Sequence, residues 1–311
     1  MEILLEPLKY EFLRHGMIAS LMVGMLCGVI GVYIVLRGMS YIGHGLSHAA
    51  FGGAVIGYVL NFNFYIGAGL WGFLAAILIN QVSKKRQIKE DAAIGIVTTS
   101  SFAIGVALIS RVRKFTKSFE AALFGNILGV TNTDLIIIAI VTITTMLVIF
   151  FMYKQLLFTT FDRDAARIFG IKTEVVDIIF SLILAAAIIV SMNIIGVTMI
   201  AAVLVIPAIT ARMLTDSFSR MIILSTIIGG ITGLSGMYLS YYLNAASGAT
   251  IVLFAAFCFS IALLYNNLRQ RVQIHDHLHK HGDIKHTHDH DHIDVHGHGH
   301  KDNKEEDENN N

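Results

Sequence analysis

About nine apolar runs, each roughly as long as one bilayer crossing, recur along this chain of 311 residues. A membrane-spanning helix needs about 20 apolar residues, and helices satisfy their own backbone polar groups in lipid. The expected fold is therefore an all-α polytopic membrane protein with eight or nine transmembrane helices. The runs cover residues 16–36, 42–60, 64–82, 92–110, 134–153, 175–192, 194–213, 219–243 and 249–266.

Composition supports this class. Hydrophobic residues make up 55% of the chain and charged residues 14%, against about 25% charged in an average soluble domain. The formal net charge of +1 is divided among loops and the tail, so no basic face for nucleic acid is expected. Cys27 and Cys258 lie in apolar runs and offer no disulfide framework. We expect a transmembrane domain over residues 1–268 and a disordered histidine-rich tail over 269–311.

The distribution of lysine and arginine indicates how the apolar runs are oriented across the membrane. Basic residues gather in loops 84–89, 154–172 and 212–220 and at the start of the tail, whereas the alternating loops carry no charge. Because cytoplasmic loops are enriched in Lys and Arg, the C-terminus is expected in the cytoplasm. The basic segment 111–120 is external by parity and breaks the rule. Either it is an exception or a neighbouring run, such as the glycine-bearing piece 121–130, is re-entrant.

Small residues four apart predict close helix contacts at Gly24 and Gly28, Gly53 and Gly57, and Gly229 and Gly233. Pro207 lies inside an apolar run, where it either frees backbone carbonyls through a kink or only shapes the packing.

His44 and His48 are the first candidates for function. They stand four apart at the front of an apolar run, which places both imidazoles on one helix face. Strongly polar side chains in a bilayer are costly and tend to face a polar path, and imidazole suits zinc and other transition metals. A path for a metal ion is the leading interpretation, and simple hydrogen bonding to a helix partner is the alternative. A zinc protease is disfavoured because the pair lacks the glutamate of H-E-x-x-H.

The pattern of residues 159–171 predicts a short amphipathic helix. Its apolar stripe contains Phe161, Ala165, Ile168 and Phe169, and its charged face contains Asp162, Arg163, Asp164 and Arg167. Such a helix suits docking on a soluble partner or lying on lipid headgroups. The chain has no G-x-x-x-x-G-K-[ST] phosphate loop, so transport driven by ATP requires another subunit.

Taken together, these motifs resemble the permease subunits of zinc and manganese ABC importers, the ABC-3 family, over roughly residues 12–268. The resemblance rests on LRGMSYIGHGLSHAA (36–50), EDAAIGIV (90–97), LFGNIL (123–128), FDRDAARIFG (161–170) and VLVIPAITAR (203–212). It implies a type II ABC importer permease that is not itself an enzyme, forms a homodimer in a prokaryotic plasma membrane, and works with a cytoplasmic ATP-binding subunit and an extracytoplasmic metal-binding protein. The coupling residues it implies are Phe161, Asp162, Arg163, Ala165, Arg167 and Gly170.

The family commonly has aspartate at the position of His44 and histidine at that of His48. Imidazole in place of carboxylate favours zinc over manganese as the transported ion. Two copies across a dimer axis would offer four imidazoles, and weak, reversible coordination suits a conduit. No permanently bound cofactor is expected.

The tail is of low complexity and rich in histidine and aspartate, as flexible metal-binding segments are. It either receives or senses the incoming ion, restraining the ATPase when metal is plentiful, or chelates metal without a role in transport. Its candidate ligands are His275, His277, His279, His281, His286, His288, His290, His292, His296, His298 and His300.

A self-contained secondary metal carrier or exporter is the alternative function. Such carriers usually need buried carboxylates for ion coupling, and Asp177 is the clearest one here, near the end of its run. The five motifs favour the ABC permease.

Overall fold

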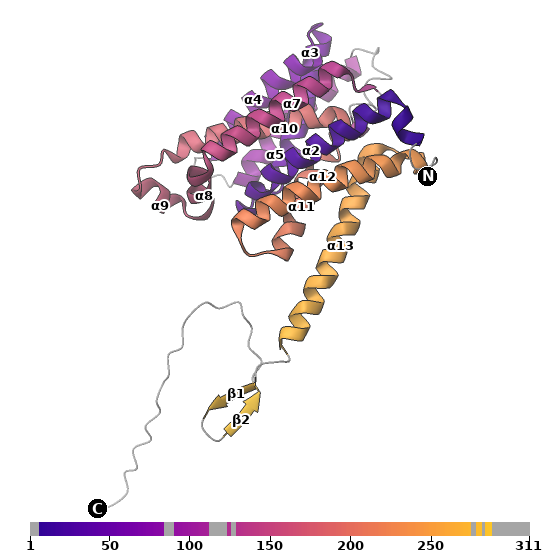
Figure 1. Ribbon diagram of the computed structural model, residues 1–311. Coiled ribbons are helices and arrows are strands. Elements are labelled where there is room, and N and C mark those ends of the chain that lie inside the picture. Colours follow the sequence, from indigo (N-terminus) through magenta and orange to yellow (C-terminus); the bar gives the residue numbers. More distant parts are fainter. Residues whose placement is uncertain are drawn as a thin grey trace, which may run out of the picture. The chain divides into compact units, whose positions relative to one another are not determined.

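Helices dominate the computed structural model, which describes residues 6–83, 90–111, 123–125, 129–274, 278–281 and 284–287 (Figure 1). The chain divides into two compact units, Met1–Leu263 and Leu264–Asn311. The helices are η1 (Glu6–Lys9), α2 (Glu11–Leu36), α3 (Ile42–Val59), α4 (Phe64–Ser83), α5 (Glu90–Arg111), α7 (Asn132–Phe151), α8 (Tyr153–Phe161), α9 (Arg163–Ile168), α10 (Thr173–Ile195), α11 (Ile200–Leu214), α12 (Phe218–Leu243) and α13 (Ser247–Ile274).

Each of the nine expected apolar runs coincides with a helix. Within the described residues, seven helices are long and apolar enough to cross a membrane. The other two are α11, with 15 residues, and α3, whose 18 residues include several glycines and two histidines. The all-helical class is therefore confirmed, whereas the count of eight or nine crossings stays a prediction.

The bundle has a protein-facing centre and a lipid-facing rim. In α2 and α10, 72% of the most apolar window is buried, against 17% in α7. The outer face of α7 carries large apolar side chains at alternating spacings of four and three, namely Ile136, Ile140, Ile143, Leu147 and Phe150. A stripe of this kind would be an aggregation hazard in water, but it is the surface that a bilayer solvates.

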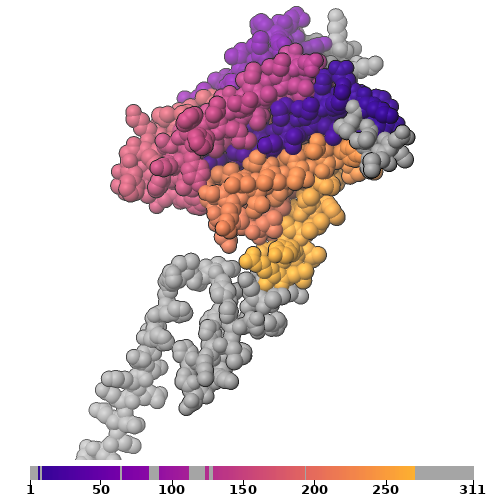
Figure 2. Space-filling model, in the orientation of Figure 1, coloured from indigo at the N-terminus to yellow at the C-terminus, as the bar shows by residue number. Residues whose placement is uncertain are grey.

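Glycine brings the central helices into backbone contact, as the small-residue pairs predict. A Cβ on Gly24 would lie 2.1 Å from the carbonyl oxygen of Gly229, and one on Gly28 would lie 2.4 Å from that of Ser225. The Ser225 hydroxyl in turn donates to the Gly28 carbonyl at 2.6 Å. Figure 2 shows the resulting seam, with the indigo surface of α2 along the orange surface of α12.

A second glycine contact joins α3 to α4. Gly53 and Gly57 meet Gly67, and the Gly57 Cα would lie 2.8 Å from a Cβ placed on Gly67. All three predicted small-residue pairs are thus confirmed as helix contacts.

Connections that alternate along the chain lie at opposite ends of the bundle. At one end, Arg37 contacts Asp177 and the end of α8, and Phe218 at the start of α12 packs against Tyr153 and Phe161. At the other end, Tyr65 at the start of α4 donates to Asp134 at the start of α7. This segregation is what an alternating topology predicts.

Two glycines with positive φ shape the connection between α10 and α11. Gly196 (φ +90°) ends α10, and Gly125 (φ +85°) lies against the Ile194 carbonyl. The Thr198 hydroxyl donates to the Leu123 carbonyl at 2.9 Å. Residues 123–125 thus pack on this turn. Residues 112–120 of the basic segment lie outside the described residues, as do positions 121–122 and 126–128 of the expected re-entrant piece.

In the second unit, a short antiparallel ladder pairs β1 (Leu278–His281) with β2 (Ile284–Thr287), placing His279 opposite His286. The disordered tail that the sequence predicts over residues 269–311 stays a prediction. Residues 269–274 continue α13, and apart from the two strands the remaining tail positions lie outside the described residues.

The glycine seam generates a stability prediction. Replacing Gly24 with Ala should lower the Tm of the purified protein, because the added Cβ meets the Gly229 backbone, and overpacking of this kind costs about 1–3 kcal/mol. Gly69→Ala is the matched control, since its Cβ has only Phe73 Cε2 at 4.0 Å and alanine favours the helix. Equal Tm values for both variants, measured in lipid nanodiscs, would contradict the seam.

Candidate functional site

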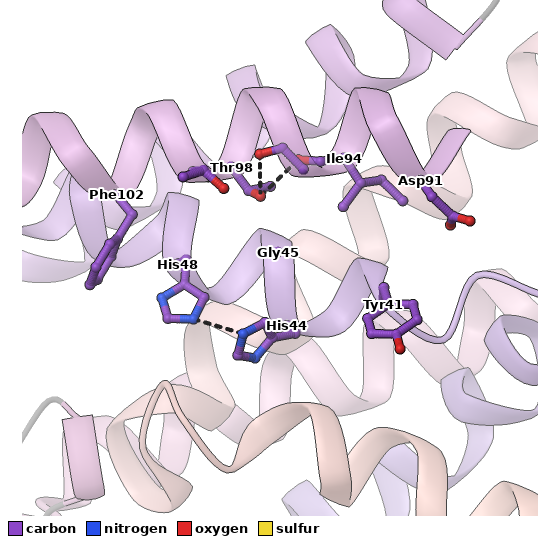
Figure 3. Close-up of a pocket in the computed structure, with 10 residues that line it drawn as sticks. Tyr41, His44, Gly45, His48, Asp91, Ile94, Thr98 and Phe102 are labelled. Carbon is purple, nitrogen blue, oxygen red and sulfur yellow. Dashed lines mark hydrogen bonds between the residues drawn. The ribbon is translucent and has the colours of Figure 1, made fainter. Parts of the chain in front are cut away.

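His44 and His48 point toward one another from successive turns of α3 (Figure 3). Their Nε2 atoms are 3.1 Å apart, and their rings are nearly perpendicular with centroids 4.4 Å apart. His44 is exposed and His48 is half-buried. The helical spacing therefore produces the shared imidazole face that the sequence predicts.

This geometry suits a single shared ion. Two nitrogen ligands of a tetrahedral zinc ion, each at about 2.0–2.1 Å, are about 3.3 Å apart. The two Nε2 atoms are already close to that separation, so small ring rotations would direct both lone pairs at one ion. Without an ion, the same atoms share one hydrogen bond.

The pair faces a cavity of about 450 Å³ between α3 and α5. Asp91, Ile94, Thr98 and Phe102 line it from α5, and Tyr41 precedes α3 at one side (Figure 3). Glycines hold the two helices together along this wall. A Cβ on Gly45 would lie 2.7 Å from Ile94 Cγ2, and one on Gly52 would lie 2.3 Å from the Ser101 carbonyl oxygen.

Further contacts fix α3 and the His48 ring. The Ser47 hydroxyl contacts the His44 carbonyl at 2.7 Å and the Val197 carbonyl at 3.1 Å, which ties α3 to the turn between α10 and α11. Phe102 packs its ring on His48 with centroids 4.7 Å apart. His48 Nδ1 is buried and has no hydrogen-bond partner within the described part of the chain. In metal sites, a hydrogen bond from the second ring nitrogen of a histidine ligand strengthens metal binding about 10–100-fold.

No third His, Cys, Asp or Glu among the described residues joins the pair closely enough to complete a metal site. Asp91 is exposed in the first turn of α5 and lines the cavity. His15 is partly buried, with 18% of its side chain exposed, and its Nδ1 lies 3.4 Å from the Val130 carbonyl oxygen. One chain thus supplies two imidazoles.

The expected amphipathic helix is two helices. Asp162 has extended backbone angles (φ −147°, ψ 100°) and separates α8 from α9, and its Oδ1 accepts a hydrogen bond from the Ala165 amide at 2.8 Å. A capping aspartate begins a new helix instead of continuing the old one. The prediction of one helix with a continuous apolar stripe through Phe161 and Ala165 is therefore wrong, because Phe161 ends α8 and Ala165 belongs to α9. Beyond the break, Ile168 is 85% exposed and Phe169 75% exposed.

The remaining expected coupling residues occupy different settings. Arg163, the first residue of α9, pairs with Asp177, whereas Arg167 makes a looser contact with Asp164 at 3.4 Å. Gly170 ends this segment with φ +78°. Sequence reasoning did not anticipate that Arg37 also reaches Asp177, although an arginine between two apolar runs was a signal.

The long apolar helices define this chain as a multi-pass membrane protein. Comparison with known families identifies it further. The ABC 3 transport family matches residues 9–266, and the chain belongs to that family.

Individual relatives agree with this assignment. The manganese transport system membrane protein MntC of Listeria monocytogenes is 38% identical over 258 residues, which cover 83% of this chain and 92% of the relative. A probable iron transport system membrane protein of Haemophilus influenzae is 34% identical, covering 86% and 98%. The solved structure of PsaBC from Streptococcus pneumoniae in complex with Fab superposes with a TM-score of 0.76 at 35% identity, covering 86% of this chain and 98% of that chain.

The imidazole pair predicts a measurable affinity for zinc. In protein ending at Gln270, so that tail histidines do not interfere, His48→Ala should weaken zinc binding at least about tenfold, equivalent to about 1.4 kcal/mol. Competition with a fluorescent chelator measures this. His15→Ala is the control, because His15 lies outside the cavity, and it should leave the affinity unchanged. Equal affinities in all three proteins would remove the pair from metal binding.

Proposed function

We propose that this chain is the membrane-spanning permease subunit of an ABC transporter that imports divalent transition metal ions, with zinc favoured over manganese. The observation that carries the proposal is the Nε2 pair of His44 and His48, 3.1 Å apart at a cavity in a chain of the ABC 3 transport family. Relatives named for manganese and iron transport support the metal class.

The preference for zinc rests on ligand chemistry. Manganese is best served by carboxylate, carbonyl and water oxygens, whereas imidazole suits zinc. His44 supplies nitrogen where the family commonly has carboxylate. In a homodimer, two pairs would offer four imidazoles. His48 Nδ1 has no hydrogen-bond partner among the described residues, which supports the weak binding that a path requires.

ATP hydrolysis belongs to a separate cytoplasmic subunit in this proposal. The exposed apolar side chains of Ile168 and Phe169 support docking of a soluble partner on α9. The basic loops support a cytoplasmic position for this end and for the C-terminus, in a prokaryotic cell. A metal-binding protein outside the membrane would deliver the ion.

The contacts of Asp177 weigh against a secondary carrier. This carboxylate, the clearest candidate for ion coupling within a span, is paired with two arginines, Arg37 and Arg163. Each of its carboxylate oxygens is engaged by one of these arginines, as in a structural ion-pair cluster.

Uptake of radiolabelled zinc and manganese tests the proposal in cells lacking their own importers and supplied with this chain, its ATPase and its binding protein. His48→Ala should reduce zinc uptake at least about tenfold, because one of the two nitrogen ligands is lost. His44→Asp should shift selectivity toward manganese, because an oxygen ligand replaces nitrogen. If zinc and manganese uptake were the same in both variants as in the unaltered chain, the histidine pair would be excluded from the transport path.

The histidine-rich tail gives a second proposal, that it senses cytoplasmic metal and restrains the ATPase. Truncation after Gln270 should then leave uptake at low external zinc unchanged and raise it at high zinc, because the restraint is gone. Time courses of uptake over a range of zinc concentrations measure this. Identical curves for the full and truncated chains would leave the tail as a chelator without a role in transport.

A further inference from the structure

A cluster of three charged side chains, two of them largely buried, joins three separate segments at one end of the bundle. Asp177, in the second turn of α10, contacts Arg37 through one carboxylate oxygen and Arg163 through the other. Arg37 directly follows α2, and Arg163 begins α9. One carboxylate therefore bridges the connection that leads into α3 and the short surface helix.

Arg37 binds several elements at once. Its Nη1 donates to Asp177 Oδ1 at 3.1 Å, its Nη2 to Thr159 at 3.0 Å, and its Nε to Thr160 at 3.1 Å. The guanidinium also lies over the Phe180 ring, 4.5 Å from the centroid. Because guanidinium is planar and its donors are fixed in direction, this set of contacts specifies the orientation of α8 relative to α10.

Burial of Arg37 and Asp177 restricts the conformations that the cluster can adopt. Only 10% of the Arg37 side chain and 12% of the Asp177 side chain are exposed. Leaving one buried charge without its partner is strongly unfavourable, although a buried ion pair adds little net stability over apolar packing. Such a cluster is better explained by the conformation that it specifies than by stability.

Through its members, the cluster is connected along the chain both to the surface helix α9 and to the histidine pair of α3. Arg37 precedes the turn at Gly38 (φ +71°) and the start of α3 at Ile42, and His44 is the third residue of α3. On the other side, Arg163 is five residues before the exposed Ile168. Asn80 of α4 joins through bonds to the Asp177 carbonyl at 3.3 Å and to the Ser181 hydroxyl at 2.8 Å. Movement of α9 would therefore be passed to the start of α3.

We infer that Arg37, Asp177 and Arg163 are positioning residues that couple the docking helix α9 to the metal-binding helix α3. They contact no transported ion, and they act by moving the segment that carries His44. This inference rests on the proposed function, because it requires an ATPase that pushes on α9.

The test measures zinc uptake and ATP hydrolysis in the same proteoliposomes, with the full chain, its ATPase and its binding protein, and with manganese in a parallel set. Asp177→Asn should lower the ions taken up per ATP hydrolysed about 5- to 150-fold, the usual range of coupling between sites, while hydrolysis stays close to that of the unaltered complex. Arg220→Gln, an exposed arginine on α12, is the matched control and should leave the ratio unchanged.

Arg37→Lys is the second variant, because it keeps the positive charge beside Asp177 but loses the planar contacts to Thr159 and Thr160. It should lower the ratio in the same direction, and it decides the matter if Asp177→Asn does not assemble. An unchanged ratio in the assembled variants, uptake and hydrolysis falling in proportion, or failure of both variants to assemble would overturn the inference. Absence of ATP-dependent uptake by the unaltered complex would instead overturn the proposed function itself.

Discussion

Backbone contact between helices is the constraint on which this structure depends. Lipid chains are as apolar as leucine, so helices in a bilayer gain little from hiding apolar side chains from one another. Dispersion and hydrogen bonding at short range must hold them, and both require small residues. Gly24 and Gly229 satisfy this between α2 and α12, and Gly53 and Gly67 do so between α3 and α4. The other helices are placed around these contacts.

The histidine pair follows from the same constraint. Gly45 and Gly52 bring α3 against α5, and the cavity opens beside this contact, where the larger side chains of Tyr41 and Phe102 stand apart. Helical spacing directs His44 and His48 into that cavity. The chemistry of the proposed path therefore depends on packing that contains no ionisable group.

Much of this architecture could be predicted from the sequence, because membrane helices are recognisable by their length and apolar composition. The nine runs, the glycine pairs and the shared face of the two histidines all follow from local spacing. The break at Asp162 could not be predicted so easily, since an aspartate continues an amphipathic pattern as readily as it caps a new helix. The contact of Asp177 with Arg37 could not be predicted either, because Arg37 is 140 residues away in the chain.

Glycine at the contact between α3 and α5 has a consequence for how the cavity changes size. Beside the cavity, the two helices meet through main chain, where a Cβ on Gly52 would come within 2.3 Å of the Ser101 carbonyl oxygen. Rotamer changes of the side chains that line the cavity cannot alter the spacing of helices in main-chain contact. The separation of α3 and α5 therefore changes only when a whole helix tilts or slides, as a rigid-body step.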